Sequence, residues 1–337
     1  MNKLTKIGAT ALCGSLAAMS AANAGDLTVT GGVDMSYTSF PKQNAGNPIG
    51  IGSNITFGGS GEMDNGWTVA LSVAHSNKAV YSNTNVTVTV PSVGDFRVSQ
   101  GVSGSGIDRM DDMTPTVWEE AYGAGLASGI DTVSGASAGT NIEWTPNMTP
   151  SGITARLSYS PDVGGSGAAD KGTSQSSGSV KKSGYDVTMV ADGDATPDGL
   201  TVYGGLSMVD THQNGTTYND DVNEMTAGIK YAVGSFTLGY QYSKEENGRA
   251  STLTEYNNDG YGITFAVNDD LSVGYNVYKS EQTSTTNVET EASSVQVAYS
   301  AGGLSVRLAE QTVDNQSYST ATTAQRDATT LSVALAF

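Results

Sequence analysis

Six carboxylates stand in one long polar stretch of the chain, residues 102–139. They are Asp108, Asp111, Asp112, Glu119, Glu120 and Asp131, and one base, Arg109, stands among them. Four further bases occupy separate positions elsewhere: Arg97, Arg156, Lys230 and Arg307. Acids facing sparse bases across a water-filled passage would set up a transverse field, which orders water, admits small polar solutes and slows apolar ones. Two plainer interpretations stay open: the acids belong to a solvated surface loop, and the bases pair with stray carboxylates.

Covalent chemistry finds little support. The segment Gly135–Gly139 matches the pattern G-x-S-x-G, but a nucleophile elbow needs a strand before the serine and a helix after it. Here the segment lies in a run of glycine and serine, and only His75 and His212 could serve as the base. The segment 192–194, Asp-Gly-Asp, lacks the downstream spacing of a calcium loop and indicates a turn. We therefore expect no enzyme, no catalytic residue, no metal site and no cofactor.

The first 24 residues have the pattern of an export signal. Lys3 and Lys6 precede an apolar run, residues 7–22, which ends in the small-residue site Ala22-Asn-Ala24. We expect residues 1–24 to be removed, leaving 25–337 as one exported domain. A membrane anchor is the alternative, but the run is short and rich in small residues. The remaining chain has 14 basic against 34 acidic residues, a formal net charge of −20, which excludes nucleic acid as a partner.

Period-two alternation of apolar and polar residues recurs along the exported chain. In residues 27–37, for example, odd positions are apolar and even positions are mostly polar, as in a strand with one apolar face. Sixteen such strands are predicted: 27–37, 51–63, 67–73, 85–90, 96–101, 141–145, 153–159, 185–190, 200–208, 225–231, 236–242, 261–267, 271–278, 293–299, 304–308 and 329–337.

The connections between these strands alternate between short and long. Short connections are predicted at 64–66, 91–94, 146–152, 192–199, 233–234, 268–270 and 301–303, and long ones at 40–50, 76–84, 102–139, 160–184, 210–223, 244–259, 279–292 and 313–326. This order places all tight turns on one rim. Each strand also has only one apolar face, whereas its other face is small and polar. The pattern predicts an all-β fold: a transmembrane, antiparallel, up-and-down barrel of 16 strands with an aqueous interior. The third long connection, about 102–139, would fold into its lumen.

These features resemble a known family, the Gram-negative general-diffusion porins, and most of all their sixteen-stranded alphaproteobacterial branch. The resemblance rests on the terminal segment 331–337, on 94–101 leading into the long third connection, and on the first strand from Asp26. It implies an outer-membrane location in a Gram-negative bacterium, a homotrimer in contact with lipid and lipopolysaccharide, and passive diffusion of small hydrophilic solutes and ions. One departure is that the basic cluster expected opposite the loop is sparse here.

Parity along the strands assigns the charged residues to the lumen. Arg97, Arg156, Lys230 and Arg307 alternate with apolar neighbours that would face lipid, where an arginine or lysine near mid-bilayer costs about 2–4 kcal/mol. The excess of acid predicts a preference for cations. Divalent ions such as calcium could bridge the outer acids at 220–221, 245–246, 289 and 291 to lipopolysaccharide. Two alternatives stay open: a solute-specific porin for sugar, phosphate or peptide, and a non-conducting adhesin or structural barrel.

Overall fold

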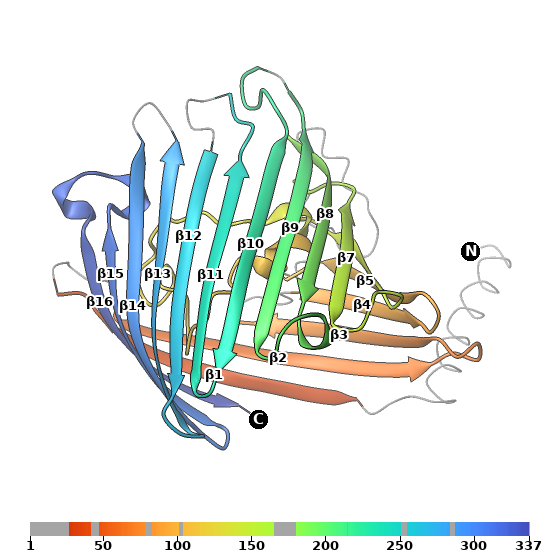
Figure 1. Cartoon of the computed structure of the whole chain (residues 1–337), viewed down its shortest axis with the longest axis horizontal. Coiled ribbons are helices and arrows are strands. Elements are labelled where there is room, and N and C mark those ends of the chain that lie inside the picture. Colours follow the sequence, from red (N-terminus) through yellow and green to blue (C-terminus); the bar gives the residue numbers. More distant parts are fainter. Residues whose placement is uncertain are drawn as a thin grey trace, which may run out of the picture.

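The computed structural model describes residues 27–41, 47–77, 83–100, 104–164, 180–213, 215–250, 255–283 and 287–336. The expected export signal, residues 1–24, lies outside them. Sixteen strands form a cylinder (Figure 1), and within the described residues no helix is long and apolar enough to cross a membrane. The strands are β1 (Thr28–Ser39), β2 (Ile49–Glu62), β3 (Thr68–Ser76), β4 (Asn83–Val90), β5 (Gly94–Gln100), β6 (Asn141–Pro146), β7 (Ile153–Ser160), β8 (Lys181–Ala191), β9 (Leu200–Thr211), β10 (Val222–Val233), β11 (Phe236–Glu246), β12 (Glu255–Ala266), β13 (Leu271–Thr283), β14 (Val288–Ala301), β15 (Leu304–Asp314) and β16 (Arg326–Ala336).

Every strand pairs antiparallel with its neighbours in the sequence, and the first strand closes the ring with the last. The seam between β1 and β16 runs from the pair Gly32–Ala336 to the pair Ser39–Thr329. Closure leaves no strand edge exposed to lipid, where unpaired backbone groups would be costly. The predicted fold class, a closed antiparallel barrel of sixteen strands, is confirmed.

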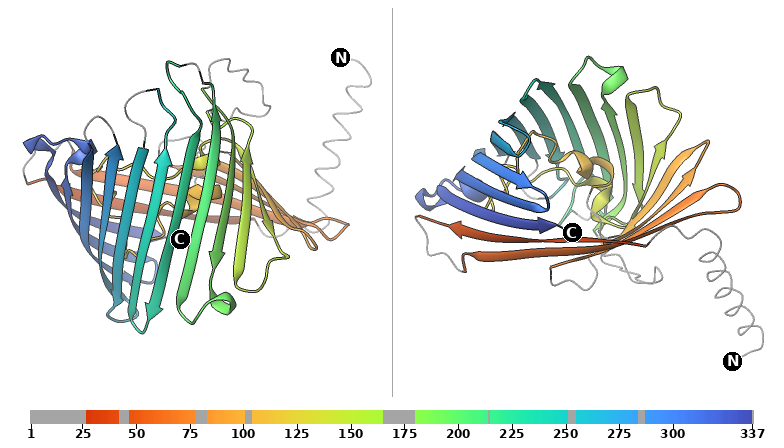
Figure 2. Two further views of the ribbon diagram at one scale, coloured as in Figure 1. Left: turned by 45° about the horizontal axis from the view of Figure 1, so that its top comes forward. Right: turned by 90° about the horizontal axis from the view of Figure 1, so that it is seen from below.

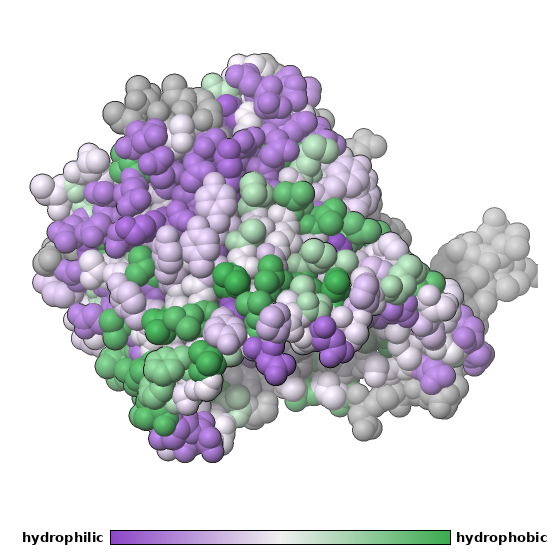
Figure 3. Space-filling view, viewed as in Figure 1, coloured by the Kyte–Doolittle hydropathy of each residue, from purple (hydrophilic) through white to green (hydrophobic). Residues whose placement is uncertain are grey.

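The predicted parity of the strands also holds. On β11 the apolar residues Phe236, Leu238 and Tyr240 are exposed on the outside, whereas Gln241, which points to the inner side, is buried. Apolar side chains can stay outside because the exterior of such a barrel meets lipid rather than water. The lower part of the outer wall is accordingly rich in hydrophobic residues, and the upper part is hydrophilic (Figure 3).

Several strands extend further beyond the apolar band than the sequence pattern predicted. β12 begins at Glu255 rather than at 261, and β14 begins at Val288 rather than at 293. The connection predicted at 279–292 therefore shrinks to residues 284–287. In this region the outward positions are polar and the ladder is held by side-chain pairs, such as Tyr240 with Asp259 (2.6 Å) and Tyr242 with Asn257 (2.9 Å). The loss of apolar alternation above the membrane explains why the sequence pattern ended too early.

Candidate functional site

The long connection between β5 and β6 lies inside the barrel. Its described part, residues 104–140, follows the inner wall and contains two short 3-10 helices, η1 (Gly106–Met110) and η2 (Gly135–Ala138). Figure 2 shows this segment within the ring of strands. Ile107 and Met110 of η1 are fully buried against the wall. The predicted loop bounds, 102–139, agree within two residues with the gap between Gln100 and Asn141.

Three glutamines of the wall hold the lumenal loop along one level. The amide of Gln241 on β11 donates to the carbonyl of Met110 (2.7 Å) and accepts from the N–H of Met113 (3.3 Å). Gln296 on β14 binds the backbone of Trp118 and Glu119 in the same way, and Gln311 on β15 binds Ala121 and Leu126. All three side chains are buried. These inward polar residues therefore position the loop rather than contact water.

Three buried carboxylates hold the two ends of the loop. Glu143 on β6 accepts the N–H of Gly106 (2.8 Å), and Asp186 on β8 accepts the N–H groups of Ile107 and Ala136 (3.1 Å each). Glu224 on β10 accepts from Ser134 and Gly135 (2.7 and 2.8 Å). Each acid meets backbone donors at the beginning of a 3-10 helix, where N–H groups have no partner within the helix.

A row of wall glycines allows the middle of the loop to approach closely. A Cβ added at Gly239 would lie 2.3 Å from the ring of Pro115, and one at Gly262 would lie 2.3 Å from the Pro115 carbonyl oxygen. Neither distance is compatible with a side chain at these positions. Because the loop is fixed along β8 to β15 in this way, its exposed side chains face the lumen.

Five of the six predicted acids lie together on the loop. Asp112 interacts electrostatically with each of the others, which are Asp108, Asp111, Glu119 and Glu120. Asp112 and Glu119 are exposed to the lumen, and the other three are half-buried. Burial, reinforced by the neighbouring carboxylates, raises the pKa of Asp111 to about 8 and that of Glu120 to about 7.

Asp131, the sixth predicted acid, lies apart from these five. Its electrostatic partners are Lys181 and Arg249, and its backbone N–H donates to the Tyr318 hydroxyl. Burial raises the pKa of Asp131, while the two bases oppose that shift. The structure therefore places Asp131 in a separate mixed-charge group.

Two of the predicted bases gather with Arg109 around Glu143. Arg97 lies directly opposite Glu143 in the pairing of β5 with β6, and Arg109 forms an ion pair with Glu143 at 2.5 Å. Arg156 on β7 interacts electrostatically with Arg97, Arg109 and Glu143. Although Arg109 was expected among the loop acids, it belongs to this arginine cluster, because η1 turns its side chain toward Glu143.

The other two predicted bases lie at separate places. Arg307 on β15 pairs with Asp34 of β1 (2.9 Å) and lies 6.0 Å from the ring centroid of Trp118. It also interacts electrostatically with Glu119. Lys230 is on β10, opposite Thr201 and Gly239 in the two neighbouring strands. The lumen is therefore bordered by an acidic loop, an arginine cluster and the Arg307–Asp34 pair.

Most of the sequence matches the profile of a known family. The profile of the Gram-negative porins matches residues 8–303. The chain belongs to the Gram-negative porin family. Together with the closed barrel, this makes it a diffusion channel of the bacterial outer membrane. No curated protein matches the sequence.

Solved structures of low sequence identity share the fold. The porin is similar to Salmonella typhi OmpF in complex with daunomycin, at 12% identity and a TM-score of 0.68, covering 92% of this chain and 97% of that one. It is also similar to an anion-selective porin from Comamonas acidovorans, at 14% identity and a TM-score of 0.68, covering 93% of this chain and 99% of that one. The trimer form of Vibrio cholerae OmpT is similar at 11% identity and a TM-score of 0.63, covering 94% of this chain and 100% of that one.

Several residues that shape the lumen of this porin were missed in the sequence. They are the three glutamines, the carboxylates Glu143, Asp186 and Glu224, and Asp34. One signal could have found Glu143, Asp186 and Glu224: each stands at an inward position between two outward apolar or neutral residues. An acid at such a position faces the loop, so it marks a place where the loop backbone can donate.

The G-x-S-x-G segment proves to be η2. Its serine hydroxyl, on Ser137, donates to the carbonyl of Ser134 (2.8 Å), and the segment is held by Asp186 and Glu224. It follows irregular backbone rather than a strand, so it has no elbow geometry.

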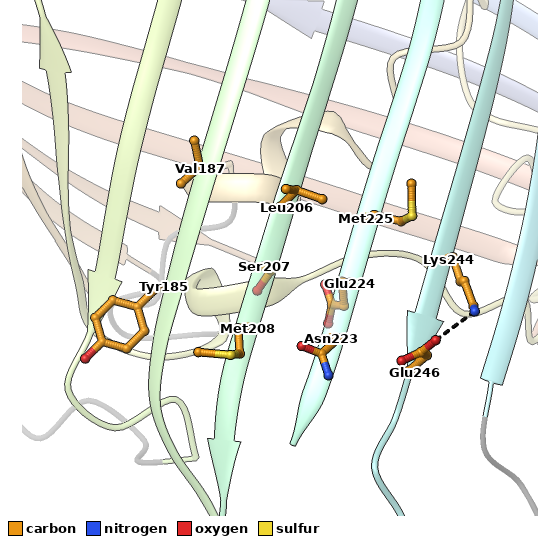
Figure 4. A pocket seen from close by; sticks show the side chains of 10 residues that line it. All are labelled: Tyr185, Val187, Leu206, Ser207, Met208, Asn223, Glu224, Met225, Lys244 and Glu246. Atoms are coloured by element: carbon orange, nitrogen blue, oxygen red, sulfur yellow. Dashed lines mark hydrogen bonds and ion pairs between the residues drawn. The ribbon is translucent and has the colours of Figure 1, made fainter. Parts of the chain in front are cut away.

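A depression of about 490 Å³ lies on the other side of the wall, over β8 to β11 (Figure 4). Its apolar lining includes the exposed side chains of Val187, Leu206 and Met225. Lys244 and Glu246, paired at 2.7 Å, lie at its polar edge. Since these apolar residues are outward-facing, the depression belongs to the lipid-facing surface and not to the channel.

Proposed function

We propose that this porin is a general-diffusion channel for small hydrophilic solutes and ions, with a preference for cations. The observation that carries the preference is the group of five acids on the lumenal loop. The bases nearest to them are partly neutralised, because Arg109 is paired with Glu143 and Arg307 with Asp34. Carboxylates therefore dominate the narrow part of the lumen and raise the local concentration of cations.

The reversal potential of purified channels in a KCl gradient tests this preference. K⁺ is expected to be more permeant than Cl⁻, because the exposed carboxylates of Asp112 and Glu119 border the passage. The double variant Asp112→Asn, Glu119→Gln should lower the K⁺/Cl⁻ permeability ratio. Asp198→Asn, in an exposed turn between β8 and β9, should leave it unchanged. A wild-type preference for Cl⁻ would refute the proposal.

The same recordings separate the two remaining alternatives. A non-conducting adhesin would give no current. A solute-specific porin would show concentration-dependent block by its sugar, phosphate or peptide, whereas a general channel conducts ohmically without it. The absence of an enzymatic activity belongs to this proposal too.

Cleavage after Ala24 is a further part of the proposal, and sequencing the N-terminus of the outer-membrane form tests that site.

We also propose a homotrimer whose protomers meet along the shortest part of the wall. β5, β6 and β7 have only seven, six and eight residues. At about 3.3 Å per residue and a tilt near 45°, six residues cannot cross an apolar band about 25 Å tall. The outward residues Val98, Ile142 and Leu157 are nevertheless exposed in the single chain. Neighbouring protomers would cover them. The trimer form of Vibrio cholerae OmpT, a structure of similar fold, supports the number of protomers.

Single-cysteine cross-linking tests this interface. The only cysteine, Cys13, lies in the expected export signal, so engineered cysteines can be read alone. Val98→Cys on β5 should give dimers and trimers with a short bismaleimide, whereas Leu238→Cys on the long strand β11 should not. Both positions are exposed to a similar extent, 46% and 43%. Cross-linking at Leu238→Cys alone would overturn this placement.

Lipid and lipopolysaccharide are the proposed partners of the outer wall. Calcium bridging through the outer acids stays a prediction, and two of these acids already pair with lysines: Glu246 with Lys244 and Glu291 with Lys279. Among the residues that the structure describes, no group of three or more His, Cys, Asp or Glu side chains is arranged to hold a metal ion. Stability of the oligomer in excess chelator would count against such a bridge.

A further inference from the structure

Two adjoining cavities lie near the seam, and the smaller one lies between the lumenal loop and the wall. One, of about 350 Å³, is bordered by Trp118 and Glu119 of the loop and by Asp34 of β1. The other, of about 450 Å³, extends from Asp34 to Arg307. Both share Asp34 and Gly52, so they form one groove, which we call the seam groove. Its volume is sufficient for a small organic molecule.

The seam groove places two opposite charges with unused hydrogen-bonding capacity near each other. Arg307 uses Nη1 for Asp34, and within the described residues its guanidinium makes no other hydrogen bond, although arginine has five N–H donors. The Glu119 carboxylate is exposed, and the hydrogen bonds formed by Glu119 involve its backbone. Asp34 is satisfied, because Arg307 and Ser332 occupy its two oxygens.

The two charges interact electrostatically but form no ion pair among the described residues, so their N and O atoms are more than 4.0 Å apart. Space therefore remains for a molecule that carries both signs. Trp118 lies beside the Arg307 guanidinium and restricts its position. Gly52, Gly123 and Gly125 line the cavity beside Glu119, and a side chain at Gly125 would collide with Thr330 of the wall.

We propose that the seam groove is a transit site for small zwitterions of the α-amino acid class. The carboxylate of the solute binds the free N–H groups of Arg307, and its ammonium group binds Glu119. A molecule with only one of these charges forms half of the contacts. This inference rests on the proposed diffusion function and names a class of solute that the channel retains briefly.

Current recordings with three matched solutes test the site. L-alanine carries both charges, ethylammonium lacks the carboxylate, and propionate lacks the ammonium group. L-alanine is expected to reduce the mean current and add noise in a concentration-dependent manner, with half-block at a concentration about tenfold lower than for either ion, since one charge-assisted hydrogen bond is worth about one decade in affinity. Equal block by ethylammonium would overturn the proposal in favour of a plain cation site.

Variants distinguish the groove from other parts of the lumen. Arg307→Gln and Glu119→Gln should each raise the half-block concentration of L-alanine about tenfold. Glu119→Gln removes no side-chain hydrogen bond, so it should fold as the wild type even if Arg307→Gln does not. Asp198→Asn is the control, expected to block as the wild type. Unchanged block in Glu119→Gln, or ohmic KCl current without any block by L-alanine, refutes the site but leaves the channel function intact. Absence of any KCl current would instead contradict the channel itself.

Discussion

An amide side chain can donate and accept at once, whereas a carboxylate can only accept. The wall of this porin uses the two groups accordingly. Gln296 meets a loop segment that offers both N–H groups and a carbonyl, and Glu224 meets one that offers two N–H groups. A buried backbone group without a partner costs about 1–3 kcal/mol, so each matched side chain matters for the position of the loop.

The loop acids make ion selectivity depend on pH. Because burial raises the pKa of Asp111 to about 8 and that of Glu120 to about 7, both are largely protonated at pH 6 and charged at pH 9. The K⁺/Cl⁻ permeability ratio should therefore rise between these two values. Reversal potentials in a KCl gradient at each pH measure it.

The double variant Asp111→Asn, Glu120→Gln should flatten this pH dependence. A K⁺/Cl⁻ permeability ratio of the wild type that falls as pH rises would contradict the prediction.

The raised pKa values of Asp111 and Glu120 also affect the stability of the folded protein with a definite sign. An acid whose pKa is higher in the folded protein holds its proton more tightly there, so these two carboxyls make the folded state less stable as pH rises from about 4 toward 8.

At the scale of elements, the strands could be predicted and the path of the loop could not. Alternation over residues such as Phe236, Leu238 and Tyr240 follows from the lipid outside. The same parity assigned Arg97 and Arg307 to the inner wall, and in the structure Arg97 contacts the lumenal loop at Gly104 and Arg307 pairs with Asp34. Gln241 has the same pattern as any water-facing residue. The fold brings Gln241 into contact with Met113, which is 128 residues away along the chain, and no local pattern encodes such a contact.

The close approach of loop and wall makes a glycine substitution informative. Gly262→Ala should displace Pro115, because the added Cβ would lie 2.3 Å from the Pro115 carbonyl oxygen. This oxygen belongs to the backbone, so it can move away only if the loop itself shifts. We expect a cost of about 1–3 kcal/mol, as for overpacking, and a smaller single-channel conductance as the loop moves into the lumen.

Single-channel recording and the midpoint of thermal unfolding measure the two effects of this substitution. Gly59→Ala on β2 is the matched control, since an added Cβ there meets nothing within 4 Å. A conductance equal to that of the wild type in Gly262→Ala would show that the loop does not limit the passage.

At the scale of the whole molecule, the barrel depends on an apolar exterior that is continuous across the seam. Leu331 of β16 lies opposite Leu308 of β15 and Tyr37 of β1, and all three face outward. Leu331→Arg should destabilise the membrane-inserted barrel by about 2–4 kcal/mol if this level is near mid-bilayer. Denaturant unfolding in lipid vesicles measures the change. Ser272→Arg, at an inward position of β13, is the control, and an equal loss in both variants would refute the assigned parity.

The pairing of β1 with β16 has a consequence for biogenesis. The two strands are separated by nearly the whole chain, yet each supplies the only partner for one edge of the other. Until the last strand is added, the sheet has two edge strands whose backbone N–H and C=O groups lack hydrogen-bond partners, and lipid cannot supply them. A polypeptide that ends before β16 lacks the strand that pairs with β1 in this structure, so closure in this register requires the last strand to be synthesised.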